Sequence, residues 1–157
     1  MKSKSKGSYF NLRADAAKVL YQILEEGQSA RECLPLAQLP HKEQDKAWLQ
    51  EMVYGVLRNL PILQFWLRQL LDKPLKNRFK IVEQLIMLGF YQLAFSRVSQ
   101  HAAVSETVAA CQPLNTLAMK GLVNAILRTF LRNEMSQQEA PNKQIASGLP
   151  KWLYKKL

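Results

Sequence analysis

The chain has 157 residues, 48% of them hydrophobic and 22% charged, which is the balance of a soluble globular protein of about one domain. Its two cysteines, Cys33 and Cys111, stand in unrelated contexts, which excludes a disulfide framework and favours a reducing cytoplasm. The formal net charge of +10 favours a polyanionic partner, nucleic acid first, although a merely basic soluble protein would carry the same charge.

Residues 1–10 are polar and basic, and we expect them to form a disordered tail. Charged residues follow the tail at once, so no signal peptide is predicted. The longest charge-free apolar run lies between Glu83 and Arg97 and is well short of the roughly 20 residues that cross a bilayer. The sequence therefore predicts a soluble, cytoplasmic protein without a membrane partner.

Helical periodicity begins directly after this tail. Asn11 is predicted to cap a first helix, and Gly27 to end it. The apolar stripe of this helix consists of Leu12, Ala16, Val19, Leu20 and Ile23. Ser29 followed by Glu32 is typical of a capping box and predicts a short helix, which Pro35 should limit.

Two further amphipathic helices are predicted in the next part of the chain. One follows Pro40, and the other is expected to be capped by Asn59, with Pro61 in its first turn. Their apolar positions are Leu49, Met52, Val53, Val56 and Leu57 in the former, and Leu63, Trp66, Leu67, Leu70 and Leu71 in the latter.

The segment 79–95 is apolar on almost every side, which predicts a helix in the middle of the domain. A buried strand is the alternative for such a run, but the length favours a helix. Ser99 is then predicted to cap a helix that contains Val104, Val108 and Cys111 and ends at Pro113.

The last helix has the clearest stripe, which consists of Met119, Leu122, Val123, Ile126, Leu127, Phe130 and Leu131. No segment alternates with a period of two, so the predicted fold is all-α with about seven helices. Residues 11–133 should form the domain and residues 134–148 a polar linker. Residues 149–157 begin a new amphipathic helix that nothing earlier pairs with, so we expect a truncated chain.

Catalytic and cofactor motifs are not found. The six glycines stand too far apart for a phosphate- or cofactor-binding loop, and the strands of a doubly wound fold are missing. His41 and His101 have no ligand partner at metal spacing, and His101 is expected to have a structural role near a helix N-terminus. Both cysteines are interpreted as small buried hydrophobes. We therefore expect no catalytic residue, cofactor or metal in this chain.

Basic residues gather in three places, which are the candidate phosphate contacts, although each could also be a solvated helix face. Arg13 and Lys18 lie on the first helix. The second group is a loop and contains Lys73, Lys76 and Arg78, opposed only by Asp72. The third is a stripe on the last helix that consists of Lys120, Asn124, Arg128 and Arg132.

The aromatic side chains favour packing over base stacking, because they fall on apolar stripes. These residues are Trp48, Trp66, Phe79, Phe90 and Phe130. RNA binding is therefore expected to be directed at the backbone, sensitive to salt and weakly sequence-specific.

Four motifs carry a family resemblance: NLR at 11–13, YGVLR at 54–58, HAAVSETV at 101–108 and KGLVNAILR at 120–128. In this order they resemble the N-terminal NusB-like domain of ribosomal-RNA methyltransferases of the RsmB (Sun/Fmu) type, over about residues 10–133. LPKWL at 149–153 also looks like the segment that leads towards the catalytic region of that family.

The resemblance implies a NusB-like fold of two packed helical subdomains. It also implies a parent enzyme that makes 5-methylcytosine in small-subunit ribosomal RNA with S-adenosylmethionine, whose two catalytic cysteines and cofactor loop lie in a C-terminal domain. By analogy with NusB relatives, Arg13 is the first expected RNA contact and Lys18 the second. Arg58 belongs to the second motif.

Three motif positions also have a packing interpretation. Gly55 and Gly121 suit close approach of helices, and Asn124 could be buried and hydrogen-bonded instead of facing RNA. A packing role for the whole motif from Lys120 to Arg128 is an equal alternative to RNA contact.

Three functions compete. The first is an RNA-binding module that positions ribosomal RNA for a C-terminal methyltransferase domain in cis. The second is a free-standing transcription antitermination factor of the NusB type, which the start of another helix at 149–157 argues against. The third is a protein-interaction scaffold that packs on the catalytic domain, its charge serving solubility.

Overall fold

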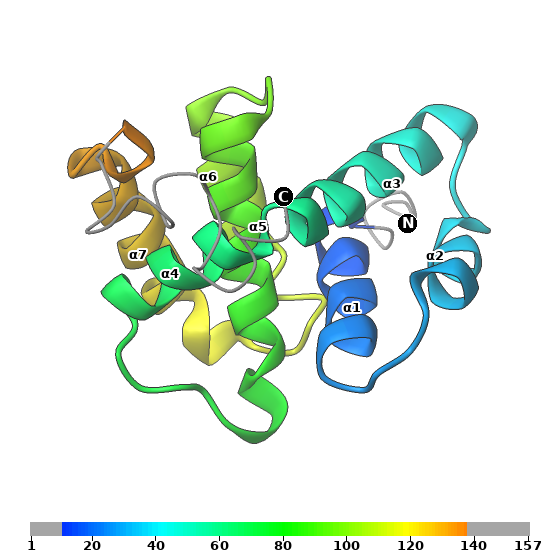
Figure 1. Ribbon diagram of the computed structural model, residues 1–157, viewed down its shortest axis with the longest axis horizontal. Helices are drawn as coiled ribbons and strands as arrows, with labels where there is room; N and C mark the ends of the chain where they lie inside the picture. Colours follow the sequence, from blue (N-terminus) through cyan, green and yellow to red (C-terminus); the bar gives the residue numbers. More distant parts are fainter. Residues whose placement is uncertain (1–10, 138–157) are drawn as a thin grey trace, which may run out of the picture.

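The computed structural model describes residues 11–137, and within this range the chain forms seven α-helices, three short 3-10 helices and no strand (Figure 1). The prediction of an all-α fold with about seven helices is therefore confirmed. The expected tail at 1–10, the greater part of the expected linker and the segment 149–157 lie outside the described residues.

The α-helices are α1 Leu12–Leu24, α2 Ala30–Gln38, α3 Glu43–Arg58, α4 Leu60–Leu70, α5 Ile81–Phe95, α6 Gln100–Ala109 and α7 Lys120–Arg132. The 3-10 helices are η2 Asn77–Phe79, η3 Leu117–Met119 and η4 Met135–Gln137. Met135 is buried against the core, so the packed domain extends slightly into the predicted linker.

Local sequence fixes three helix starts, as predicted. The side chains of Asn11, Ser29 and Ser99 each accept a hydrogen bond from a backbone N–H in the first turn of α1, α2 and α6. Gly27 has a φ of +72°, the left-handed conformation expected just after α1. Asn59 precedes α4, but its side chain makes no cap there; its Nδ2 donates to the carbonyl of Gly55 at 2.9 Å and closes α3.

Two predicted helix ends are wrong. Pro35 does not limit α2 but lies inside it. Proline has no N–H to donate to the Arg31 carbonyl, but this part of the helix is exposed, so water can bind that carbonyl instead. Cys111 lies beyond α6, which ends at Ala109. The backbone N–H and the hydroxyl of Thr116 both donate to the Cys111 carbonyl and close a turn there, at 2.8 and 3.2 Å.

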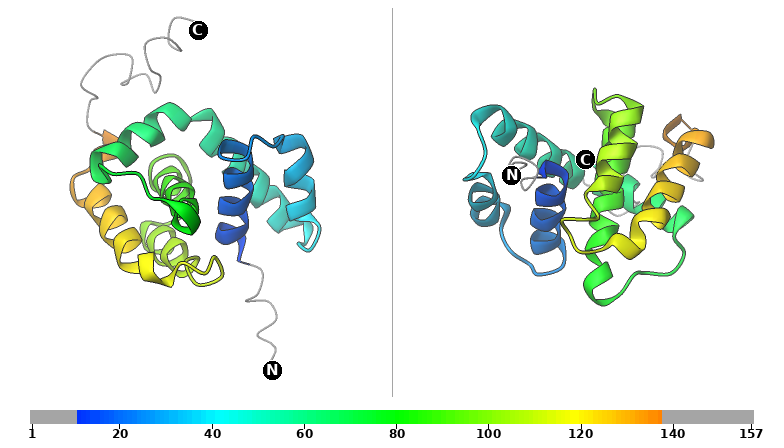
Figure 2. Two further views of the ribbon diagram at one scale, coloured as in Figure 1. Left: turned by 90° about the horizontal axis from the view of Figure 1, so that it is seen from below. Right: turned by 180° about the vertical axis from the view of Figure 1, so that it is seen from behind.

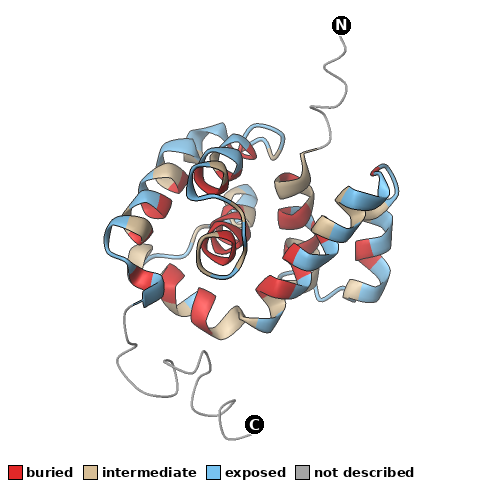
Figure 3. Cartoon of the chain, turned by 90° about the horizontal axis from the view of Figure 1, so that it is seen from above, coloured by how far each residue is buried: buried red, intermediate tan, exposed pale blue. Residues whose placement is uncertain are grey.

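The helices form two packed groups, α1–α3 and α4–α7, and α5 is shared between them (Figure 2). α1 and α3 pack on one side of α5, while α4, α6 and α7 pack on the others. Every residue from Val82 to Gln92 is buried, which explains why the sequence of α5 lacks a polar face. Figure 3 shows the buried positions on the inward sides of the surrounding helices.

Aromatic rings join three helices of the second group. Phe90 of α5 stacks on Phe130 of α7 with ring centroids 4.5 Å apart, and Trp66 of α4 meets both edge-on. No helix within residues 11–137 combines the length and the hydropathy that a membrane span requires.

Candidate nucleic-acid interface

The cationic charge of the folded part is unevenly distributed. Residues 11–58, which form α1–α3, contain six lysines and arginines and seven acidic residues. Residues 59–137, which form α4–α7, contain nine lysines and arginines and four acidic residues. A polyanion is therefore attracted to the second group of helices rather than to the first.

A buried carboxylate organises the loop between α4 and α5. Glu83 is 3% exposed, and its oxygens accept from Arg68 at 2.7 Å and from the backbone N–H of Leu75 at 2.7 Å. The Nζ of Lys80 lies 3.1 Å from the same carboxylate. Arg68 and Lys80 are thus neutralised, and the loop is tied to α5. Sequence reasoning missed this role, although a single carboxylate in an apolar run was the available signal.

The loop leaves three other cations free to meet a ligand. Lys73, Lys76 and Arg78 are exposed, and none of them forms an ion pair with another described residue. The Arg78 guanidinium lies over the ring of Phe79, 4.6 Å from its centroid, which limits where this side chain points. All three residues were predicted as phosphate contacts.

Lys120 lies at the same end of the bundle as this loop. It is the first residue of α7 and is exposed. Because α6 brings the chain back to the end where α5 begins, the segment before α7 and the loop 71–80 share one end of the second group (Figures 1 and 2). The fold thus brings one residue of the stripe on α7, Lys120, to the same end as the basic loop. We call Lys73, Lys76, Arg78 and Lys120 the basic end.

The other polar residues of α7 lie farther along the helix. Arg128 and Arg132 are exposed, and each is held within α7, by Asn124 and Thr129 respectively, at 3.1 Å. Asn124 is half-buried, and its side-chain oxygen accepts the hydrogen bond from Arg128. The polar stripe is opposite the core-facing residues of α7, as its spacing predicts.

Arg13 is engaged in helix packing. Its Nε donates to Oε1 of Gln92 at 3.0 Å, and its guanidinium lies 4.7 Å from the centroid of the Trp48 ring. Burial lowers the pKa of Arg13, and nearby Glu106 partly offsets this effect. Gln92 is fully buried and also donates to Thr107 at 2.9 Å, so Arg13 joins α1 to α3 and to the interior of α5.

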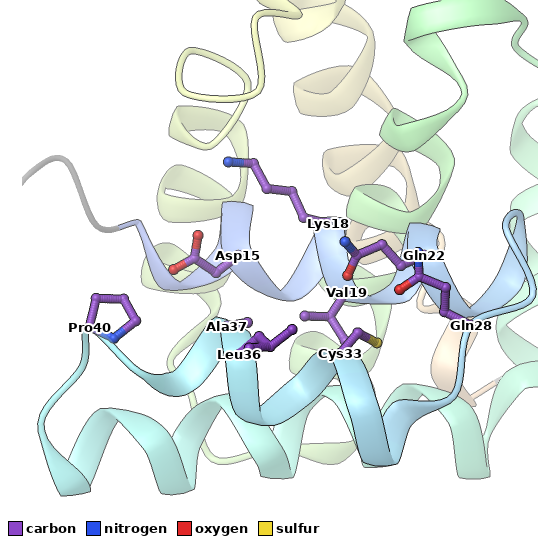
Figure 4. A pocket seen from close by; sticks show the side chains of 9 residues that line it. All are labelled: Asp15, Lys18, Val19, Gln22, Gln28, Cys33, Leu36, Ala37 and Pro40. Atoms are coloured by element: carbon purple, nitrogen blue, oxygen red, sulfur yellow. The ribbon is translucent and has the colours of Figure 1, made fainter.

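Lys18 lies apart from both the basic end and Arg13. It is exposed beside a groove between α1 and α2, whose apolar side chains are Val19, Cys33, Leu36 and Ala37. Figure 4 shows these side chains gathered between the two helices, with the amino group of Lys18 pointing away from them.

The YGVLR motif is a packing element. A Cβ on Gly55 would come within 2.1 Å of the Tyr91 ring, so only glycine allows α3 and α5 to approach as they do. The Tyr91 hydroxyl donates to Glu51 at 2.6 Å. Burial is the main cause that raises the pKa of Tyr91 to about 12, and the Glu51 carboxylate adds to it, whereas Arg58 acts in the opposite direction. Arg58 is exposed.

Two other motif residues, Gly121 and His101, lie at the surface. Gly121 is exposed and a Cβ there would meet nothing within 4 Å, so the predicted close helix approach is wrong at this position. His101 is exposed at the second position of α6, and its structural role stays a prediction.

The remaining candidate ligands are structural. His41 is 8% exposed, and its Nε2 lies 2.6 Å from Oδ2 of Asp15, which ties the turn after α2 to α1. Cys33 and Cys111 are buried, as predicted, and burial raises the pKa of both thiols. Within residues 11–137, no three His, Cys, Asp or Glu side chains gather as a metal site would require.

Comparison with known proteins gives one family and one group of relatives. The model of the NusB family matches residues 11–132. A protein of Sodalis glossinidius named ribosomal RNA small subunit methyltransferase B is 40% identical, over 96% of this chain and 35% of its own length. Proteins of the same name from Pectobacterium carotovorum and Vibrio cholerae are 44% and 42% identical, over 93% and 96% of this chain. The chain spans about a third of the length of these relatives.

Proposed function

The chain belongs to the NusB family, and from this premise we propose that it is an RNA-binding module. It positions small-subunit ribosomal RNA for a methyltransferase domain that is joined to it in cis in the whole protein. The observation that carries this proposal is the basic end, where Lys73, Lys76, Arg78 and Lys120 are exposed and have no ion pair with a described residue.

Binding at the basic end works through phosphate contacts. Lysine and arginine side chains neutralise phosphates and release condensed counterions, so affinity falls steeply as salt rises. Glu83 fixes the course of the loop that presents three of these cations. The module therefore supplies affinity and orientation, while recognition of the target base belongs to another part of the protein.

We assign the chemistry of the whole protein to the part that lies outside this chain. Its relatives are named as methyltransferases, and we infer methylation of cytosine at carbon 5 with S-adenosylmethionine in the cytoplasm. The residues at 11–137 do not fit that cofactor, because their only secondary structure is helical and their four glycines lie far apart. No step of the reaction is therefore assigned to Cys33 or Cys111.

A scaffold that docks on the catalytic domain is the second candidate. Leu36 of α2 and Leu39, which directly follows this helix, are 67% and 70% exposed, and they lie in the group of helices that lacks excess positive charge. Such side chains suit contact with protein. A free-standing antitermination factor is the third possibility, and the threefold greater length of the relatives speaks against it.

The test is a salt titration in which binding to a hairpin of small-subunit ribosomal RNA is measured by fluorescence anisotropy. Lys76→Ala with Arg78→Ala should weaken binding and reduce the slope of log affinity against log salt by about two, or about one per lost phosphate contact. The matched control is Arg31→Ala with Lys42→Ala, which removes the same charge from the first group of helices. Equal effects of the two double variants would reject the basic end as the binding site.

A second measurement concerns the chemistry. We expect no methyl transfer when the chain is mixed with S-adenosylmethionine and RNA, because the reacting groups are assigned elsewhere. Turnover by this chain would refute that assignment. Failure of the unaltered chain to bind RNA at low salt would reject the RNA-binding function itself and leave the scaffold.

A further inference from the structure

A second surface of interest is a groove of about 500 Å³ between α3 and the turn that joins α5 to α6. Trp48 and Met52 line it from α3, and residues 95–98 line it from the turn. One wall thus comes from each group of helices, and the groove exists only because the two groups pack together.

Phe95 is the exposed aromatic side chain of this groove. It is the last residue of α5 and is 47% exposed, whereas Phe90 one turn earlier is fully buried. Its ring is stacked on Trp66 at 6.0 Å with an interplanar angle of 24°, and it also touches Tyr91. Phe95 therefore offers a held, partly open ring rather than a loose apolar side chain.

One arginine stands beside this ring and is open to a ligand. Arg97 is exposed, forms no ion pair with any described residue, and belongs to a fixed turn: the Ser96 hydroxyl donates to the Gln92 carbonyl at 2.8 Å and accepts from the Val98 N–H at 3.1 Å. On the opposite wall the Trp48 ring is covered in part by the Arg13 guanidinium, which does not line the groove and already donates to Gln92.

One acidic residue, Glu51, lines the groove, and the Tyr91 hydroxyl donates to it. The cation of the groove is thus the single guanidinium of Arg97 beside an aromatic surface, and its single carboxylate already accepts a hydrogen bond. An apolar peptide would match the aromatic surface but not Arg97. A nucleotide matches both, because it combines a flat base with a phosphate.

We propose that this groove binds one unpaired nucleotide of RNA, with its base on Phe95 and its phosphate at Arg97. The inference rests on the proposed RNA-binding function and adds a selectivity to it. A paired base is already stacked within its helix and cannot enter, so the groove favours RNA with an unpaired loop or end. The basic end, by contrast, contacts phosphates of paired and unpaired RNA alike.

The experiment compares a ribosomal-RNA hairpin that has 2-aminopurine in its loop with a fully paired duplex of the same length. Phe95→Leu keeps apolar contact with Trp66 but removes the π-face, and Phe95→Tyr keeps the π-face. Tyr54→Leu is the matched control, because Tyr54 is 37% exposed on α3 and does not line the groove. The matched control for Arg97→Met is Arg31→Met, because Arg31 is also an exposed arginine and lies on α2.

We expect Phe95→Leu to weaken hairpin binding about five- to tenfold, at the low end of what a base–aromatic stack contributes, and to leave duplex binding and the salt slope unchanged. It should also abolish the quenching of 2-aminopurine, which Phe95→Tyr should retain. Arg97→Met should weaken hairpin binding and reduce its salt slope by about one.

The outcomes separate this inference from the proposed function. Unchanged hairpin affinity and quenching in Phe95→Leu, together with a loss in Lys76→Ala with Arg78→Ala, would overturn the groove and leave RNA binding at the basic end. Equal loss for hairpin and duplex would also overturn it, because the effect would then be on the fold. No RNA binding by the unaltered chain would overturn both, and the groove would then be a candidate contact for protein.

Discussion

The Glu83 carboxylate gives the sharpest prediction about stability. Substitution Glu83→Gln keeps the size of the side chain but removes the charge that faces Arg68, Lys80 and the N–H of Leu75. The new amide N–H₂ must also face at least one of these donors. A buried ion pair that loses one partner costs about 3–5 kcal/mol when both charges are inaccessible to water.

The cost here is smaller, because water can still reach the two cations. The side chains of Arg68 and Lys80 are 39% and 27% exposed, whereas that of Glu83 is 4% exposed. We therefore expect a loss of about 2 kcal/mol in the free energy of unfolding, close to the value of one hydrogen bond to a charged group. For a domain of this size that loss lowers the melting temperature by about 4–8 °C.

Urea unfolding followed by circular dichroism measures this change, and the control is Glu134→Gln, which alters an exposed carboxylate. The midpoint should fall for Glu83→Gln with the slope unchanged, and stay the same for the control. Equal midpoints for the two variants would refute the reasoning, since the three contacts of Glu83 would then contribute nothing. RNA affinity of the folded variant should fall as well, because the loop 71–80 loses its attachment to α5.

Three other predictions concern the helices. Gly55→Ala should destabilise the fold by about 1–3 kcal/mol in urea unfolding, because its Cβ would overlap the Tyr91 ring. Gly121→Ala should leave stability unchanged or raise it by up to about 1 kcal/mol, because a Cβ there meets no other atom. A loss of stability in Gly121→Ala would contradict this open position. Asn11→Ala should cost about 1 kcal/mol by removing the cap of α1, and thermal unfolding that matches the unaltered chain would argue against that cap. The pKa of Tyr91 is about 12, above the 10 of an unfolded tyrosine, so its contribution to stability is present in full below pH 10 and is lost as pH rises from 10 to 12. Comparison of urea midpoints with Tyr91→Phe across that range tests this, and parallel curves would show that Tyr91 does not titrate as described.

Sequence by itself determined the helices of this protein. Caps such as Asn11, Ser29 and Ser99 act on neighbouring backbone groups, and apolar stripes repeat with the helical period, so both can be recognised without knowing what lies across the core. The same is true of the apolar run that became the central α5. Where a local signal was mild, as at the exposed Pro35, the helix continued because packing and solvation outweighed it.

Only the tertiary structure decided which charged and aromatic residues are available to a ligand. Arg13 lies in a basic stretch, yet its Nε is bonded to Gln92, 79 residues away. Arg68 and Lys80 belong to a basic stretch of the sequence but are neutralised by Glu83, whereas Phe95 ends an apolar helix and remains exposed. Availability depends on partners distant in sequence, and no periodic pattern records them because hydrogen bonds and ion pairs across a core are set by three-dimensional packing.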